Sequence, residues 1–375
     1  MIVRTPPMGW NSWNTFGPNI NEELIKTTAD AMVENGLPKA GYNYLVIDDC
    51  WAELKRDENH RLVPSKEKFP NGMKAVADYV HSKGLKFGMY SCSGTMTCAG
   101  YPSSFQYEFI DAKTFAEWGV DFLKYDYCFK PASVNGDLLY KRMGMALANC
   151  GRDILFSACS WGADGTHEWI KTTGAHMWRS TGDINDSWQS IKDLYNVQVK
   201  LQPYNGKGCF NDMDMLVVGM NGKGNVGVKG CTTEEYRTHF SIWAFFNSPL
   251  MIGCDVRNMT PEAKEILTKK EIIAINQDPA QRQPFKICEY WGNTAWCKQL
   301  EGGDLAVLVL NLEEHDITPF FIFSDLGLDR SCAVKLEMTD LWTGETLGVF
   351  RDQFRAKKTL KPHECLMLRC RLIDE

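Results

Sequence analysis

The sequence predicts an α/β protein, with a (β/α)8 TIM barrel over residues 1–285 and a C-terminal antiparallel β-sandwich over residues 286–375. Two observations carry this prediction. Short apolar segments alternate with amphipathic ones through the first part, as parallel strands and their covering helices do. Near Pro284 the helical periodicity ends, and short alternating segments separated by Gly and Asp follow. A chain of 375 residues is long enough for one large domain and one small domain.

Eight strand–helix units account for the first part, and no GxGxxG motif follows the first strand, which favours a barrel over an open doubly wound sheet. Strands are predicted at 8–10, 44–47, 86–90, 122–125, 154–157, 177–179, near Phe210, and at 249–252. Helices are predicted at 23–35, 73–83, 111–118, 138–148, 167–173, 188–201 and 234–246. Thr232 and Glu235 have the spacing of a capping box at the start of the last helix. Gly36, Gly84 and Gly119 stand where helices should end.

The second part reads as a small antiparallel β-sandwich, because its apolar and polar residues alternate over short segments. Its strands are predicted at 287–290, 295–299, 305–311, 318–322, 332–340, 345–350 and 364–368. No site is evident in this part, and a supporting role for the barrel is the simplest expectation.

Composition narrows the class of protein. The chain is 44% hydrophobic and 12% aromatic, enough for a sizeable core. A net charge of -6 without a cluster of Lys and Arg argues against a nucleic-acid partner. No apolar run reaches the roughly 18 residues of a membrane span, and no signal region opens the chain. We therefore expect a cytoplasmic protein with no membrane partner, unless a leader has been removed. The 14 cysteines lack CxxC spacing, so structural zinc is not expected.

Acidic residues follow three of the predicted strands. Asp126 ends an apolar run and comes two residues after Lys124. Asp48 and Asp49 come directly after the strand at 44–47, and Asp183 follows the strand that ends at Arg179. In a barrel, the residues after the strands face one mouth, where the active site lies. The residues expected at this mouth are Trp13, Asp48, Asp49, Trp51, Tyr90, Lys124, Asp126, Ser160, Trp161, Arg179, Asp183, Asp212 and Asp214. Acids, aromatic rings and two cations together suit a sugar pocket, and paired carboxylates suit glycoside hydrolysis.

The spacing leaves several functions open. In a retaining glycosidase, Asp126 would be the nucleophile, kept charged by Lys124, and Asp183 the acid/base, although Asp residues at strand ends also serve as helix caps. A metal hydrolase would use Asp48, Asp49, Asp212 and Asp214, but no His joins them and no HExxH or DxDxDG motif occurs. A sugar-binding protein without catalysis would not need both carboxylates. No metal and no cofactor are expected.

Several motifs resemble the α-galactosidase and α-N-acetylgalactosaminidase family, glycoside hydrolase family 27 of clan D. They occur in the family's order and span essentially the whole chain. The motifs are Pro7-Met8-Gly9-Trp10-Asn11-Ser12-Trp13, Ile47-Asp48-Asp49-Cys50-Trp51, Gly88-Met89-Tyr90, Thr97-Cys98-Ala99-Gly100, Lys124-Tyr125-Asp126, Trp178-Arg179 through Asp183-Ile184, Asn211-Asp212-Met213-Asp214 and Ile275-Asn276-Gln277-Asp278-Pro279. The family fold is a TIM barrel followed by a β-sandwich, and its mechanism retains the anomeric configuration.

The resemblance implies a role for each matched residue. Asp126 is expected as the nucleophile and Asp183 as the acid/base. Asp48 and Asp49 would hold the O6 and O4 hydroxyls of the sugar, and Lys124 would bind its O3 and O4 hydroxyls. Arg179 and Asp214 would contact the O2/O3 side of the sugar. Trp13 and Tyr90 would line the pocket, with Trp161 beside them. The substrate would be a small oligosaccharide or glycoconjugate. The aglycone stays open, as does the oligomeric state, with a homo-oligomer as one alternative.

Two departures from the family pattern bear on specificity and on redox state. Ser160 and Ala163 resemble the N-acetylgalactosaminidase branch, in which small side chains make room for a 2-acetamido group. α-Galactosidase is the favoured activity, and α-N-acetylgalactosaminidase the alternative; a β-L-arabinopyranosidase is disfavoured, because Asp48 is retained. Cys50 and Cys159 match half-cystines of the family whose partners are absent, since Pro18 and Ala175 stand about where those partners would fall. Cys98 and Cys128 match a pair near the active site that is bridged in secreted relatives, and their oxidation state is left open.

Overall fold

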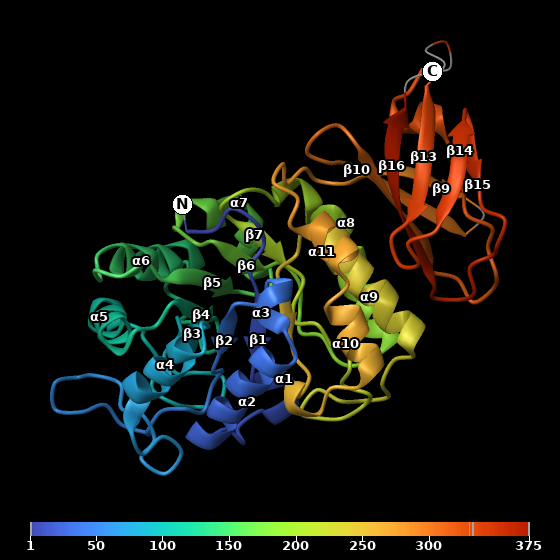
Figure 1. Cartoon of the computed structure of the whole chain (residues 1–375). Coiled ribbons are helices and arrows are strands. Elements are labelled where there is room, and N and C mark those ends of the chain that lie inside the picture. Colours follow the sequence, from blue (N-terminus) through green and yellow to red (C-terminus); the bar gives the residue numbers. More distant parts are fainter. Residues whose placement is uncertain (1, 291, 330, 332–333, 374–375) are drawn as a thin grey trace.

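The computed structural model describes residues 2–290, 292–329, 331 and 334–373, and it contains a barrel and a separate β-domain (Figure 1). The barrel is one parallel sheet of eight strands in the order β7-β6-β5-β4-β3-β2-β1-β8. Its strands are β1 (Met8–Asn11), β2 (Tyr44–Val46), β3 (Lys86–Cys92), β4 (Phe122–Asp126), β5 (Leu155–Cys159), β6 (Met177–Arg179), β7 (Phe210–Asp212) and β8 (Leu250–Ile252). The predicted strand–helix alternation is confirmed.

The sheet closes between β7 and β8. Leu216, just beyond β7, forms a parallel bridge with Ile252. Its N–H donates to Met251 O at 2.7 Å, and Gly253 N–H donates to Leu216 O at 2.9 Å. The first residues of several strands, including Tyr44 and Phe122, form a separate apolar cluster at one end of the barrel. The carboxyl ends of the strands are left for polar side chains.

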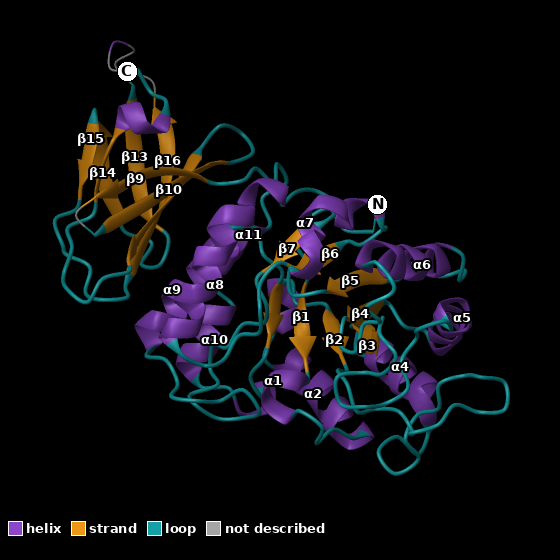
Figure 2. Ribbon diagram, turned by 180° about the vertical axis from the view of Figure 1, so that it is seen from behind, coloured by secondary structure: helices purple, strands orange, loops and turns teal. Residues whose placement is uncertain are grey.

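Helices cover the outside of the barrel (Figure 2). The α-helices are α1 (Trp13–Phe16), α2 (Glu22–Glu34), α3 (Leu37–Ala40), α4 (Gly72–Ser82), α5 (Glu108–Trp118), α6 (Gly136–Ala148), α7 (Thr166–Trp169), α8 (Trp188–Leu201), α9 (Thr233–Phe245), α10 (Pro261–Leu267) and α11 (Lys270–Asn276). Short 3-10 turns lie at η1 (Ala163–Gly165), η2 (Ile170–Thr172), η3 (Gln202–Tyr204), η4 (Val256–Asn258) and η5 (Phe323–Leu326). The capping box of Thr232 and Glu235 is present. The short helices α1, α3, α10 and α11 were not predicted.

The C-terminal domain packs a sheet of two strands against a sheet of six, as the sandwich prediction requires. The large sheet has the order β14-β13-β16-β11-β10-β9, and the small one pairs β12 with β15. Its strands are β9 (Phe285–Tyr290), β10 (Asn293–Gln299), β11 (Leu305–Asn311), β12 (Phe320–Ile322), β13 (Lys335–Asp340), β14 (Thr346–Arg351), β15 (Gln353–Arg355) and β16 (Cys365–Ile373). The short β15 was not predicted, and residues 332–333 of a predicted strand lie outside the described part.

Both faces of the large sheet are covered. Along β11 every side chain is buried, and alternate residues face opposite ways. Leu305, Val307 and Val309 belong to the core of the sandwich, whereas Ala306, Leu308 and Leu310 belong to the core shared with the barrel helices. In the described part of the chain, no helix combines the length and apolar character needed to cross a membrane.

Candidate active site

A cavity of about 230 Å³ opens at the carboxyl ends of the barrel strands. It is lined by Asn11, Trp13, Asn14, Asp48, Asp49, Tyr90, Cys98, Lys124, Asp126, Cys128, Cys159, Trp161, Arg179, Asp183, Ile184, Asp214, Met215 and Val226. The structure therefore brings the predicted site residues together, with the exception of Ser160 and Ala163. Trp51 and Asp212, which were expected at the mouth, lie outside the lining.

Asp126 is the last residue of β4 and its carboxylate is buried in the cavity wall. Oδ1 accepts the Tyr127 N–H at 2.9 Å, and Oδ2 accepts the Tyr90 hydroxyl at 3.0 Å. Burial raises the pKa of Asp126 to about 6, although the charge of Lys124 opposes this shift. The carboxylate is therefore ionised at neutral pH and carries a proton below about pH 6.

Asp48 is held by two donors, Asn11 at the end of β1 and Lys124 on β4. Its Oδ2 lies 2.8 Å from Lys124 Nζ and accepts a hydrogen bond from Asn11 Nδ2, also at 2.8 Å. Asn11 Oδ1 accepts the N–H of Trp13 at 2.9 Å, so one amide orients both an acid and the start of the next turn. Burial lowers the pKa of Lys124, but the nearby acidic groups, with Asp48 foremost, together outweigh burial and hold the pKa well above its usual value.

Asn11 was not predicted as a site residue. The signal for it was present in the sequence, since it ends the first strand and lies within the motif that supplies Trp13.

Asp49 anchors a second loop, because its Oδ2 accepts the Ala99 N–H at 3.0 Å and its Oδ1 accepts the Cys50 N–H at 2.7 Å. Burial raises the pKa of Asp49.

Arg179, the last residue of β6, joins two acids. Its Nη2 lies 2.9 Å from Asp183 Oδ1, and its Nη1 lies 2.9 Å from Asp214 Oδ1. Asp214 is buried, and burial raises its pKa in spite of Arg179. The side chain of Asp183 is 77% exposed. Partial desolvation tends to raise the pKa of Asp183, but the charge and hydrogen bond of Arg179 outweigh it and leave the pKa below its usual value.

The wall after β5 differs from the prediction made for Ser160 and Ala163. Ser160 is fully buried, and its hydroxyl lies 2.8 Å from Thr166 Oγ1. The cavity is lined instead by Cys159 and Trp161, and Cys159 Sγ lies 3.8 Å from Arg179 Nη1. Strand register could have indicated this, because Cys159 pairs with Asp126 across the parallel sheet and so shares its face.

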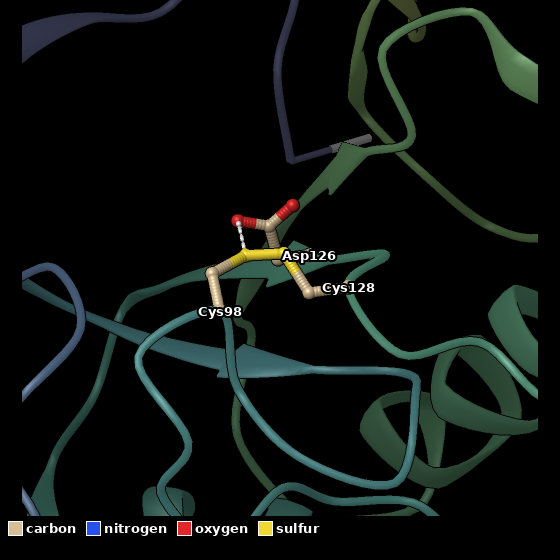
Figure 3. A group of neighbouring side chains, drawn as sticks. All are labelled: Cys98, Asp126 and Cys128. Atoms are coloured by element: carbon tan, nitrogen blue, oxygen red, sulfur yellow. Dashed lines mark hydrogen bonds between the residues drawn. A yellow bond between two sulfur atoms is a disulfide. The ribbon is translucent and has the colours of Figure 1, made fainter.

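A disulfide between Cys98 and Cys128 joins the loops that follow β3 and β4 (Figure 3). Cys98 Sγ lies 3.4 Å from Asp126 Oδ2 and 3.3 Å from the Tyr90 hydroxyl. The bridge therefore lies directly against the buried acid of the cavity. Cys50 and Cys159, whose family partners are missing from the sequence, are buried free thiols.

The acids that a metal hydrolase would need are engaged with the protein itself. Asp48 is paired with Lys124, Asp214 is paired with Arg179, and Asp212 accepts the Asp214 N–H at 2.9 Å. Each of these acids thus has at least one carboxylate oxygen engaged within the protein. The arrangement instead offers two carboxylates of contrasting character, Asp126 buried and Asp183 exposed, together with aromatic rings and the half-buried ammonium group of Lys124.

Sequence and structure comparisons agree with this geometry. Residues 5–278 match the family described as alpha galactosidase A, and residues 292–370 match the alpha galactosidase C-terminal beta sandwich domain. An α-galactosidase of Cyamopsis tetragonoloba is 44% identical over 367 residues, covering 98% of this chain and 86% of that protein.

Two solved structures share both domains of the fold. α-Galactosidase I of Mortierella vinacea is 36% identical with a TM-score of 0.91, covering 98% of this chain and 97% of that one. An α-galactosidase of Saccharomyces cerevisiae, solved with raffinose, is 29% identical with a TM-score of 0.89, covering 99% and 98%. The chain belongs to the α-galactosidase family of glycoside hydrolases.

Proposed function

We propose that this protein hydrolyses terminal non-reducing α-D-galactosides with retention, through a covalent glycosyl-enzyme on Asp126 and with Asp183 as the acid/base. Family membership and the names of the relatives support the substrate class. The observation that carries the roles is the contrast between the two acids. Asp126 is buried in the wall and fixed by two hydrogen bonds, whereas Asp183 is exposed at the mouth.

In the first step, a carboxylate oxygen of Asp126 attacks the anomeric carbon while Asp183 donates its proton to the leaving oxygen. In the second, Asp183 takes a proton from water, which attacks the anomeric carbon and frees Asp126. The hydrogen bonds from Tyr90 and Tyr127 hold the Asp126 carboxylate in one orientation, which favours a single line of attack. The exposure of Asp183 lets it meet both a leaving alcohol and water.

The cavity suits one sugar ring. Its volume of about 230 Å³ lies below the ~300–1,000 Å³ of sites for drug-sized ligands, as expected for an exo-acting enzyme that holds a single terminal residue. Asp48 and Lys124 offer an acceptor and a donor to adjacent hydroxyls, and Trp13 and Tyr90 line the cavity with aromatic rings. We assign Asp48 to the C6 side of galactose.

The alternative activity on α-N-acetylgalactosaminides is disfavoured. It depends on space beside Ser160 and Ala163, but the cavity is lined at this point by Cys159 and the large ring of Trp161. Galactose, with a hydroxyl at C2, needs no such space.

Initial rates on p-nitrophenyl glycosides test the proposal, with α-D-galactopyranoside, α-D-N-acetylgalactosaminide and β-L-arabinopyranoside compared on the wild type. We expect a large excess on the galactoside and α-galactose as the first product by proton NMR. Asp126→Asn should abolish turnover, and Asp193→Asn, an exposed acid on α8, should leave it unchanged. Near-native turnover by Asp126→Asn on a natural disaccharide would refute the proposed mechanism.

A further inference from the structure

Cys98, Asp126 and Cys128 form a compact group at the cavity wall. One ligand atom from each residue, two sulfurs and a carboxylate oxygen, lies within 4.8 Å of the other two. Figure 3 shows both sulfur atoms beside the carboxylate. Cys98 is exposed and Cys128 is half-buried, so a small reductant can reach the bridge from solvent.

We propose that reduction of the Cys98–Cys128 bridge creates a site for a thiophilic divalent cation such as Zn²⁺, with both sulfurs and the Asp126 carboxylate as ligands, and that an occupied site blocks the enzyme. In the first step a dithiol reductant gives up two electrons and two protons and becomes a disulfide. Cys98 and Cys128 each gain one of these protons. The cation then displaces both thiol protons, because zinc binds the thiolate.

The geometry needs little adjustment to hold such an ion. Zinc binds sulfur at about 2.3 Å and carboxylate oxygen at about 2.0–2.2 Å, so ligand atoms around one tetrahedral ion stand roughly 3.3–3.8 Å apart. The three atoms already lie within 4.8 Å of one another, on a strand end and two adjoining loops. Opening the bridge lets the sulfurs separate to this spacing. Three protein ligands leave one tetrahedral position for water.

The charges at the group also favour a cation once the bridge is open. Two thiolates and one carboxylate supply three negative charges. The nearby ammonium of Lys124 is already paired with Asp48 at 2.8 Å. A bound ion would occupy the carboxylate oxygens that the proposed reaction needs, so it would compete with the sugar.

The test compares oxidised and reduced protein. One sample is reduced with dithiothreitol, which is then removed under anaerobic conditions, and both samples are titrated with Cd²⁺ while thiolate-to-cadmium charge-transfer absorption is followed. Because 11 further cysteines in the described part of the chain are free thiols, the difference between the two samples is the relevant quantity. We expect one additional equivalent of Cd²⁺ in the reduced sample. Equal binding by both samples would overturn the proposal.

Variants locate the ion without relying on activity. Reduced Cys98→Ser and Cys128→Ser should each lose the additional equivalent, and reduced Asp126→Asn should bind it at least tenfold more weakly. Cys150→Ser, which removes a half-buried thiol at the end of α6, should keep it. If reduced Cys98→Ser keeps the additional equivalent, the ligand assignment is wrong.

Inhibition is measured separately. Zn²⁺ at one equivalent above the background should lower galactosidase activity at least tenfold in the reduced protein and leave the oxidised protein unchanged, and free galactose should protect. Equal inhibition of both forms would show that zinc acts elsewhere. Because Cd²⁺ binding is read from absorption, a failure of the proposed hydrolytic function would not be mistaken for a failure of the metal site.

Discussion

The guanidinium of Arg179 forms an ion pair with Asp183, with 2.9 Å between Nη2 and Oδ1, and so holds the exposed acid in its ionised form. Asp126 shows the opposite shift, because its burial raises its pKa to about 6. In the free enzyme a single proton therefore resides mainly on Asp126. The proposed reaction needs that proton on Asp183, so the productive form is a minor one until substrate displaces the ion pair.

This distribution predicts the pH dependence of kcat/KM, which reports the free enzyme. For an alkyl galactoside, which needs acid assistance, kcat/KM should fall above about pH 6, because the single shared proton is then lost. For 2,4-dinitrophenyl α-galactoside, which needs little assistance, kcat/KM should instead rise through about pH 6 to a plateau as Asp126 ionises. Profiles of the same shape for both substrates would contradict the assignment of the two acids.

Asp126→Asn should be inactive but more stable than the wild type. The folded protein binds the Asp126 proton more tightly than the unfolded chain, so stability is lost as pH rises through about 4 to 6 and stays lower above that range. A shift from 3.8 to about 6 corresponds to at most about 3 kcal/mol. Urea unfolding at pH 7.5 should show a gain of up to this size. At pH 4, where the wild type is largely protonated, the gain should nearly vanish, and an equal gain at both pH values would exclude this explanation.

Asp48→Ala should change the sugar preference. The substitution removes the acceptor that we assign to the C6 hydroxyl and leaves the ammonium of Lys124 without its partner. We expect the galactoside rate to fall about ten- to a hundredfold, the loss typical of one hydrogen bond from the C6 hydroxyl to a charged acceptor. The β-L-arabinopyranoside rate should fall much less, because that sugar lacks the C6 arm. Asp48→Asn serves as the control of similar shape, and equal losses on both sugars would remove Asp48 from C6 recognition.

Lys298 should make stability depend on pH at the contact between the two domains. This buried β10 lysine donates to Asn247 Oδ1 and, at 2.8 Å, to Ile275 O, and burial lowers its pKa to about 7. The unfolded chain keeps the proton up to about pH 10.5, so stability rises from pH 7 towards that value. Relative to Lys298→Met, the wild type should gain about 2 kcal/mol between pH 7 and 9, as measured by urea unfolding. A constant difference would mean that Lys298 stays charged in the fold.

Much of the barrel could be predicted because each strand is a short apolar run that ends in polar residues. The pieces that were missed are short. Three residues of β15 have too little periodicity to be read, and α10 has seven residues. The start of α10 was nevertheless encoded, because Thr260 caps it and Pro261 stands at its first position.

The placement of side chains in the cavity could be predicted where strand ends determine side-chain direction, but not in the turn after β5. Lys124 and Asp126 pair with Ser157 and Cys159, so alternation places Cys159 on the cavity side and Ser160 on the other. Trp161 then adopts a left-handed backbone conformation with φ of 57°. No local sequence pattern predicts this conformation for a bulky residue. The redox state of the Cys98–Cys128 pair could not be predicted, since it depends on proximity between two loops.

The two-faced burial of β11 has a consequence for recombination among relatives. Its Ala306, Leu308 and Leu310 belong to the barrel's core, and on the neighbouring strand Trp296 donates to the Tyr195 hydroxyl of α8 at 2.9 Å. The two domains are thus joined by a shared apolar core and not only by the chain between them. In a chimera whose barrel and sandwich come from different parents, the residues on the two sides of this contact must therefore come from the same parent. Otherwise the two apolar faces do not fit, and each domain is left with an exposed apolar surface.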